Sequence, residues 1–382
     1  MQLTPTLTLD LEAEFPVLGE VDFFNHAAVA PMSGRAAKAM QDAAEACTKR
    51  AYLTPGWYGE VVRVKQTAAD LVHARGPHEI AFIPNTTTGL AMLAGGLDWQ
   101  AGDRAVITDV EYPANRYPWT DLKRHGVEVV EARQRDDLRI DVQDVIDLID
   151  DRTRIVALSH VQYASGFRID LKPIAEAVHA VGGLLCVDAI QSVGMLPVDV
   201  QAMGIDFLSA DGHKWMLGPE GAGFLYCHED LAPTVKPPIA GWMGRVNALD
   251  YGSYDERYQP DARRFEPGTW NIPGIKAMGA SLSLLNEVGI DTVWKRIDAL
   301  NQHLRGGLAD KGYRVVTPGG PDERSGILSF LPPAGVDPAA IEQQLQANRI
   351  ILAMRGGRLR ASPHFYNSIE QVDRLLAELP TG

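Results

Sequence analysis

The sequence predicts an α/β protein with a large domain, built on a mostly parallel sheet covered by helices, and a smaller α/β domain near its C-terminal end. Between residues 79 and 227, short β-branched runs alternate with longer segments whose apolar residues recur three and four positions apart. This alternation is typical of strands joined by amphipathic helices. With 382 residues, of which 46% are hydrophobic, the chain is also long enough to form two cores.

Six short apolar runs in this region are expected to be strands, because each is bounded by turn-forming residues and most are rich in β-branched residues. They are IAFI (80–83), AVIT (105–108), VEVV (127–130), RIVALS (154–159), LLCVD (184–188) and FLSA (207–210). Segments 86–97, 142–149 and 171–182 are expected to be covering helices. In such sheets, functional side chains gather at the carboxyl ends of the strands.

Beyond the sheet the composition changes twice. Residues 232–271 are rich in Gly, Pro, Tyr, Trp and charge, which predicts a long irregular connection. A helical stretch over 275–311 follows, and then a strand at 326–330 and helices at 339–349 and 368–379. We therefore expect an N-terminal segment of residues 1–20 that packs on the small domain, a large domain of residues 21–272 and a small domain of residues 273–382.

The composition argues against several classes of partner. A net charge of −13 is unfavourable for binding nucleic acid or an anionic membrane, since both need clustered Lys and Arg. The cysteines Cys47, Cys186 and Cys227 lack the spacing of a disulfide framework or a zinc site, and no metal is expected. The N-terminal residues do not resemble a secretory signal, and no uncharged run has membrane-spanning length. We expect a cytoplasmic protein.

The strongest chemical signal is an acid and an amine that follow two neighbouring strands. Asp188 ends LLCVD, and Lys214 comes shortly after FLSA. Parallel neighbours place their carboxyl ends at one edge of the sheet, so both groups can face one small ring. Pyridoxal phosphate requires such a pair, an amine that forms an imine with its aldehyde and an acid that keeps its pyridine nitrogen protonated. Taken singly, Lys214 could be a solvated lysine and Asp188 a loop cap.

Three other segments could contact this cofactor. Thr86 and Thr87 lie between an expected strand and an expected helix, where helix amides and hydroxyls favour a phosphate, although a single threonine there would be an ordinary helix cap. His213 is a second phosphate candidate or a structural histidine. Tyr112 could stack on the pyridine ring or pack in the core.

Two arginines near the C-terminal end are candidates to hold a substrate carboxylate. Arg355 and Arg360 lie in LAMRGGRLRASPHFYN, and a guanidinium fork matches the geometry of a carboxylate. Gly356 and Gly357 favour a tight loop near a ligand over a helix face, with a solvated charge run as the alternative.

Together these motifs resemble the class V aminotransferase family, the pyridoxal phosphate enzymes of fold type I that include cysteine desulfurases, isopenicillin N epimerase, kynureninase and C–S lyases. The resemblance runs from FFNHAAVAPM through NTTTG, EYPANRYPW, SHVQYASG, VDAIQS and SADGHKW to RRFEPGTWN and RGGRLRASPHFYN. It implies a seven-stranded, mostly parallel sheet in the large domain, pyridoxal phosphate as cofactor, an amino-acid substrate and a homodimer with shared active sites.

The resemblance also implies a role for each matched residue around the cofactor. Lys214 corresponds to the Schiff-base lysine, Asp188 to the partner of the pyridine nitrogen, Gln191 to the neighbour of the phenolic oxygen and Tyr112 to the residue stacked on the ring. The matched phosphate contacts are Thr86, Thr87 and His213.

Further matches concern the substrate and the second subunit. Thr269 corresponds to a residue that reaches the phosphate of the other subunit, and Arg355 to the substrate-carboxylate arginine. Three residues are expected near that carboxylate, namely Asn25, His26 and Ala27.

The sequence departs from the family pattern in two places. Asp211 stands where a small or hydroxyl residue usually donates to the phosphate, and an acid there would repel a dianion unless it turned away or shared a proton. No cysteine occurs between residues 325 and 368, where a desulfurase carries its nucleophilic thiol. The second departure disfavours persulfide-forming cysteine desulfurase activity.

The expected function is chemistry at Cα of an amino acid held as an aldimine, with Lys214 as the general base. Aminotransferase and C–S (β-elimination) lyase activity are preferred. An amino-acid epimerase of the isopenicillin N epimerase type and a non-catalytic ligand-binding protein on the same fold are the alternatives. A dinucleotide-dependent oxidoreductase is disfavoured, because no GxGxxG turn follows an early strand.

Overall fold

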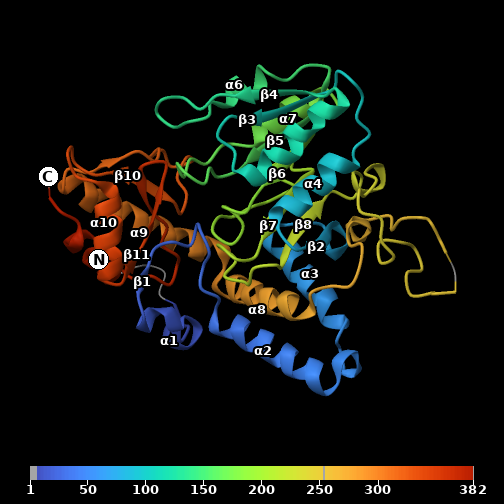
Figure 1. Cartoon of the computed structure of the whole chain (residues 1–382), viewed down its shortest axis with the longest axis horizontal. Helices are drawn as coiled ribbons and strands as arrows, with labels where there is room; N and C mark the ends of the chain where they lie inside the picture. Colours follow the sequence, from blue (N-terminus) through green and yellow to red (C-terminus); the bar gives the residue numbers. More distant parts are fainter. Residues whose placement is uncertain (1–6, 253, 382) are drawn as a thin grey trace.

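The computed structural model describes residues 7–252 and 254–381, and a seven-stranded sheet lies at the centre of its larger part (Figure 1). The strands across this sheet are β2 (Ile80–Ile83), β8 (Gly223–Cys227), β7 (Phe207–Asp211), β6 (Leu184–Asp188), β5 (Thr153–Ser159), β3 (Arg104–Thr108) and β4 (Glu128–Ala132). Six of these strands run in one direction, and β8, between β2 and β7, runs in the opposite direction. The predicted fold class, α/β with a mostly parallel seven-stranded sheet, is confirmed.

Both faces of the sheet are buried, as expected where helices cover a parallel sheet on each side. Val187 and Leu208 belong to one core, and Cys186 and Phe207 belong to the core on the opposite face. Helix α4 (Thr86–Gly96) packs so closely against β7 that no side chain would fit at Gly89. A Cβ atom there would lie 2.3 Å from Ser209 Oγ. This close approach fixes the start of α4 beside the carboxyl end of β7.

The other helices of the larger part lie around this sheet (Figure 1). They are α2 (Gly34–Lys49), α3 (Gly59–Leu71), α5 (Tyr117–Thr120), α6 (Val142–Ile146), α7 (Lys172–Ala180) and α8 (Ile272–Val288). Short 3-10 helices span Pro16–Gly19, Ala51–Leu53, Pro77–Glu79, Pro113–Asn115, Asp121–His125, Ala232–Thr234 and Ala262–Phe265. The helical stretch expected over 275–311 is two helices, α8 and α9 (Ile290–Asp310), because Gly289 between them adopts φ +80°.

The smaller part contains an antiparallel sheet in the order β12 (Ala353–Arg355), β13 (Arg358–Ala361), β10 (Leu328–Leu331) and β9 (Arg314–Val315). Its core is shared with α9, α10 (Pro338–Ala347) and α11 (Ile369–Glu378). No described helix combines the length and apolarity that a bilayer crossing requires.

The N-terminal residues contact the smaller part. Strand β1 (Asp22–Phe23) pairs in parallel with β11 (Ile350–Ile351). Phe15, which follows α1 (Leu11–Glu14), stacks on Tyr366 with ring centroids 3.8 Å apart. Residues 1–6 of the expected N-terminal segment lie outside the described residues.

A row of hydrogen bonds joins the two parts beside β5. Four consecutive backbone carbonyls, those of residues 163–166, each accept a hydrogen bond from a side chain of the smaller part. The donors are Arg360 to Tyr163 (2.8 Å), Ser329 to Ala164 (2.6 Å), Thr317 to Ser165 (2.6 Å) and Ser325 to Gly166 (2.7 Å). We call this row the 163–166 seam.

Candidate active site

A cavity of about 300 Å³ lies at the carboxyl ends of β6 and β7 and at the start of α4. This volume is at the lower end of the range for small-molecule sites, roughly 300–1,000 Å³. Most residues predicted for cofactor and substrate line it, namely Ala27, Thr86, Thr87, Tyr112, Asp188, Gln191, His213, Lys214, Arg355 and Arg360. Three predicted residues are not among its lining residues: Asn25, His26 and Thr269.

Asp188 presents a carboxylate oxygen without a partner. Its side chain is almost fully buried at the end of β6, and its Oδ1 accepts a hydrogen bond from the Ile190 amide at 3.1 Å. Within the described residues, Oδ2 has no hydrogen-bond partner. Burial is the main cause that raises the pKa of Asp188, with the nearby Glu111 carboxyl as a further cause. A cationic N–H donor from a ligand would satisfy this oxygen.

Lys214 follows β7 and shares the cavity with Asp188. The pairing of Asp188 with Ser209 places the ends of β6 and β7 side by side. Burial lowers the pKa of the Lys214 amine to about 8, with smaller contributions from the charges of neighbouring arginines. A lysine with a lowered pKa is more often neutral, which both nucleophilic attack on an aldehyde and proton abstraction require.

Tyr112 forms one wall of the cavity. The Lys214 Nζ atom lies 5.6 Å from the centroid of its ring. The ring meets Tyr163 edge-on, with centroids 5.1 Å apart, and it remains 46% exposed. A flat ligand bound covalently to Lys214 would therefore lie within reach of an aromatic face.

The start of α4 lines the cavity with Asn85, Thr86 and Thr87. Asn85, not a threonine, caps the helix, and its Oδ1 accepts from the amide of Thr88 at 2.9 Å. The amides of Thr86 and Thr87 precede the first intrahelical hydrogen bonds and are available to an anion. Thr86 Oγ1 accepts a hydrogen bond from the Asp211 amide at 3.0 Å, and this bond joins the first turn of α4 to the end of β7.

Asp211 faces His213 in the same cavity. Its Oδ2 lies 2.9 Å from His213 Nδ1, and its Oδ1 accepts a hydrogen bond from the Gly212 amide at 2.8 Å. The Gly212 amide therefore engages one carboxylate oxygen, and the His213 ring lies beside the other.

Gln191 is held in a fixed orientation beside the cavity. Its Nε2 donates to the Ala27 carbonyl at 3.0 Å, and its Oε1 accepts from the indole N–H of Trp215 at 2.7 Å. One amide hydrogen remains for a ligand oxygen.

Arg360 and Arg355 both reach the cavity but differ in burial. Arg360 is 1% exposed, donates to the Tyr163 carbonyl, and leaves its Nε without a partner in the described residues. Burial lowers its pKa to about 10. Arg355 is exposed, and its Nη1 donates to the Met354 carbonyl at 2.8 Å. A buried guanidinium without a carboxylate favours Arg360 over the predicted Arg355 as the group that holds a substrate α-carboxylate.

The three predicted N-terminal substrate residues, Asn25, His26 and Ala27, lie at different places relative to the cavity. Ala27 lines the cavity, whereas Asn25 Oδ1 accepts a 3.4 Å hydrogen bond from Arg360. His26 is fully buried away from it, where Nδ1 donates to the Ser362 carbonyl at 2.8 Å and Nε2 faces the Tyr366 hydroxyl at 2.6 Å. His26 thus packs the N-terminal segment onto the smaller part.

Thr269 is exposed and lies outside the cavity. The segment before it is anchored by Glu266, a buried carboxylate that accepts from the Phe82 amide and from Lys65 Nζ, both at 2.8 Å. Thr269 therefore lies three residues after the anchored Glu266 and is exposed to solvent.

Glu111 is a structural residue of the site that sequence reasoning did not identify. It immediately precedes Tyr112, is buried, and accepts hydrogen bonds from the side chains of Thr108, Asn115, Ser159 and Gln162 and from the Ser159 amide. Thr108 and Ser159 are the last residues of β3 and β5, and Gln162 lies just beyond β5. Glu111 therefore holds the Tyr112 segment beside the strand next to Asp188.

Replacing Glu111 with glutamine is expected to destabilise the protein by about 1–3 kcal/mol, because an amide NH2 would face donors that need an acceptor. The free energy of unfolding in urea measures this change. Glu12→Gln, at an exposed position of α1, is the control and should change stability by less than about 0.5 kcal/mol. Equal stability of Glu111→Gln and the unmodified chain would contradict the role assigned to Glu111.

The residues of the cavity fit pyridoxal phosphate. The unpartnered Asp188 oxygen suits a protonated pyridine nitrogen, the α4 amides suit a phosphate, and Lys214 lines the same cavity.

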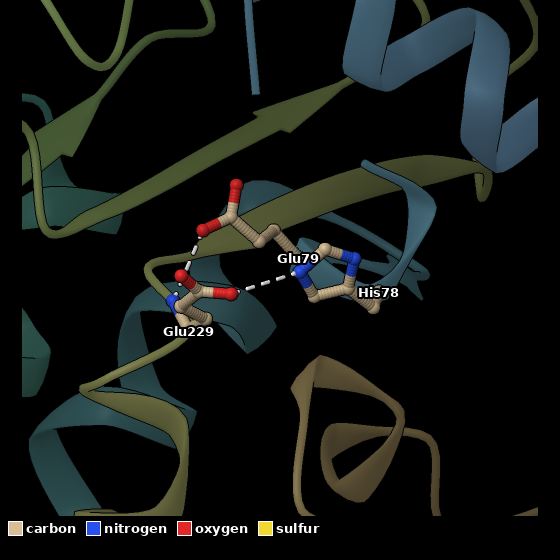
Figure 2. A group of neighbouring side chains, drawn as sticks. All are labelled: His78, Glu79 and Glu229. Atoms are coloured by element: carbon tan, nitrogen blue, oxygen red, sulfur yellow. Dashed lines mark hydrogen bonds and ion pairs between the residues drawn. The ribbon is translucent and has the colours of Figure 1, made fainter. Parts of the chain in front are cut away.

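A second group of titratable side chains lies at the opposite edge of the sheet, where His78, Glu79 and Glu229 approach one another (Figure 2). Glu79 is fully buried and accepts from the amides of Arg75 (2.8 Å) and Glu229 (3.0 Å). Glu229 in turn contacts the Arg75 guanidinium and lies 3.3 Å from His78 Nε2. Because donors of the chain already engage these oxygens, the group joins the start of β2 to the end of β8.

The pattern of the class V aminotransferase family matches residues 26–375. A probable cysteine desulfurase of Methanothermobacter thermautotrophicus is 31% identical over 96% of each chain. An uncharacterized aminotransferase of Bacillus subtilis is 30% identical over 79% of each chain.

Solved structures resemble the whole chain. An apo cysteine desulfurase from Thermococcus onnurineus superposes with a TM-score of 0.88 at 25% identity, covering 99% of this chain and 97% of that one. The cystine C–S lyase C-DES, in complex with its reaction product cysteine persulfide, gives a TM-score of 0.88 at 25% identity, covering 95% of this chain and 98% of that one.

Proposed function

Because the chain belongs to the class V aminotransferase family, we propose that it is a pyridoxal phosphate enzyme that cleaves a bond at Cβ of an α-amino acid, as a C–S lyase does. Pyridoxal phosphate is the cofactor. The observation that carries the proposal is the presence of Lys214 and the unpartnered Asp188 oxygen in one small cavity, at the ends of adjacent parallel strands.

Bound in this cavity, the cofactor supplies an electron sink for charge that develops at Cα. The residues of the chain supply positioning and proton transfer. Arg360 holds the α-carboxylate, and Lys214 Nζ removes the Cα proton. The electron pair left at Cα then forms a double bond to Cβ as the Cβ substituent departs with its own bonding pair. The Tyr112 side chain would limit the movement of the cofactor's pyridine ring.

The three cysteines support release of sulfur to solution rather than to an enzyme thiol. Cys47 is exposed on α2, whereas Cys186 and Cys227 are buried within β6 and β8, and none of them lines the cavity. Burial raises the pKa of both sheet thiols, which keeps them protonated and unreactive. Several relatives are named cysteine desulfurases, so a sulfur-containing substrate is part of the proposal.

Transamination is the second candidate, favoured by the relative named an aminotransferase. Incubating the purified holoenzyme with a panel of amino acids, with and without a keto-acid acceptor, separates the two. A lyase releases a keto acid and ammonia without an acceptor, whereas an aminotransferase consumes the amino acid only when an acceptor is present. Turnover of no amino acid under either condition would contradict both.

We also propose that two copies of the chain share their active sites. The segment after β8 extends away from the body of the protein (Figure 1) and exposes Leu249, Tyr251 and Tyr254, the last at 96%. Large exposed apolar side chains of this kind are typical of interaction surfaces. A homodimer would cover them and would bring the outward-facing Thr269 to the partner's cofactor.

The dimer predicts a particle of twice the 41.7 kDa chain mass at assay concentrations. Sedimentation equilibrium of the holoenzyme measures this mass directly. A fully active particle of 41.7 kDa would contradict shared active sites.

A further inference from the structure

The β12–β13 hairpin carries three arginines on one face. Arg355 lies directly opposite Arg358 across the hairpin, and Arg360 lies two residues beyond Arg358 on the same strand. Residues opposite each other in an antiparallel pair, and residues two apart along a strand, share a face. Leu359, on the other face, is fully buried in the core of the smaller part.

The turn of this hairpin fixes that arrangement. Gly356 and Gly357 have φ values of +56° and +73°, as the central residues of a two-residue turn with two left-handed positions require. The hairpin therefore cannot slip by one residue without moving all three guanidinium groups to the other face.

No carboxylate of the described chain balances these charges. None of the 30 ion pairs found among the described residues includes Arg355, Arg358 or Arg360. Like charges placed opposite each other destabilise a hairpin. Such an arrangement persists where a ligand benefits from it, and two of the three arginines line the cavity beside Lys214.

The charges of the cavity leave one cation without an assigned partner. Asp188 is matched by the pyridine nitrogen, Lys214 carries the cofactor, the α4 amides take its phosphate, and Arg360 is taken to hold the substrate α-carboxylate. Arg355 remains, exposed at the mouth, with one hydrogen bond to the neighbouring Met354 carbonyl. Its guanidinium has five N–H donors, of which this hydrogen bond uses one.

We propose that the substrate is an α-amino acid whose side chain carries a second anionic group, a carboxylate or another oxyanion, and that Arg355 binds this group. The inference rests on the proposed function, because it takes the α-carboxylate to be held by Arg360. Arg355 is thus a specificity-determining residue, and it should contribute little to binding of amino acids with neutral side chains.

The test measures binding of two amino acids that lack a Cα proton, α-methylaspartate and 2-aminoisobutyrate, to the holoenzyme. The shift of the cofactor absorption band on titration gives each dissociation constant. We expect α-methylaspartate to bind at least about tenfold more tightly than 2-aminoisobutyrate. Arg355→Met should weaken α-methylaspartate about tenfold, as loss of a charge-assisted hydrogen bond does, and leave 2-aminoisobutyrate unchanged.

Arg358→Met is the matched control, since it removes the same charge from the same hairpin at a position that does not line the cavity. It should change neither dissociation constant. Equal binding of both probes to the unmodified enzyme would overturn the inference, as would equal effects of Arg355→Met and Arg358→Met. Absence of any spectral response to either probe would instead contradict the proposed function and remove the premise of the inference with it.

Discussion

Replacing Lys214 with alanine is expected to lower kcat by about 10²–10⁴-fold or more, the range that a positioned general base contributes. The loss has two causes, because the same amine attaches the cofactor and removes the Cα proton. Among the residues that the structure describes, no other lysine lines the cavity to take its place. Steady-state assay with the most active amino acid of the panel measures kcat, and the visible absorption spectrum reports attachment of the cofactor.

Lys172→Ala provides the control for this prediction. Lys172 is 65% exposed at the start of α7, and its amine lies 3.9 Å from Glu176. It should retain both kcat and the absorption spectrum of the unmodified enzyme. If Lys214→Ala kept kcat within tenfold of normal, or kept an unchanged spectrum, Lys214 would not be the attachment site.

Asp188→Asn is expected to lower kcat by about 10²–10³-fold, the effect of removing one preorganised electrostatic group from an active site. Asparagine has the same shape and can keep the 3.1 Å hydrogen bond from the Ile190 amide, so the change isolates the charge. Without the carboxylate the pyridine nitrogen loses the partner that holds its proton, and the ring accepts electrons less readily. Assay of kcat at saturating substrate measures the effect.

Two controls distinguish loss of charge from loss of structure. The midpoint of thermal unfolding of Asp188→Asn should stay close to that of the unmodified apoenzyme, or rise, because burial opposes ionisation of this carboxyl group. Asp109→Asn, an exposed position beyond β3, should leave kcat unchanged. Full activity of Asp188→Asn would remove the proposed electrostatic role.

The sequence was most informative where local pattern and tertiary environment agree. The six predicted strands all exist, and in all but the edge strand β4 most β-branched and apolar residues are buried within the sheet. Strand β8 (Gly223–Cys227) was not identified, since its short run begins with glycine and its antiparallel direction breaks the strand–helix alternation. Asp188 and Lys214 could be placed because strand ends in a parallel sheet share one edge.

Contacts between distant parts of the chain limited the prediction of the site. His26 lies in a motif that suggests substrate binding, but its ring contacts Ser362 and Tyr366, more than 330 residues away. Glu111 stands next to the predicted Tyr112, yet two of its donors, Ser159 and Gln162, are 48 and 51 residues away in the sequence. The difference in burial between Arg355 and Arg360 depends on how the hairpin meets Tyr163, which no local pattern specifies.

The 163–166 seam bears on how substrate enters. Its four hydrogen bonds each stabilise the closed arrangement by about 0.5–1.5 kcal/mol, so rotating the two parts away from each other costs roughly 2–6 kcal/mol from this row alone. Hinge-opened molecules would then make up at most about a few per cent of the population. We infer that the substrate enters by rotation of two exposed side chains that line the cavity, Tyr112 and Arg355. The two parts of the protein would keep the same position relative to each other.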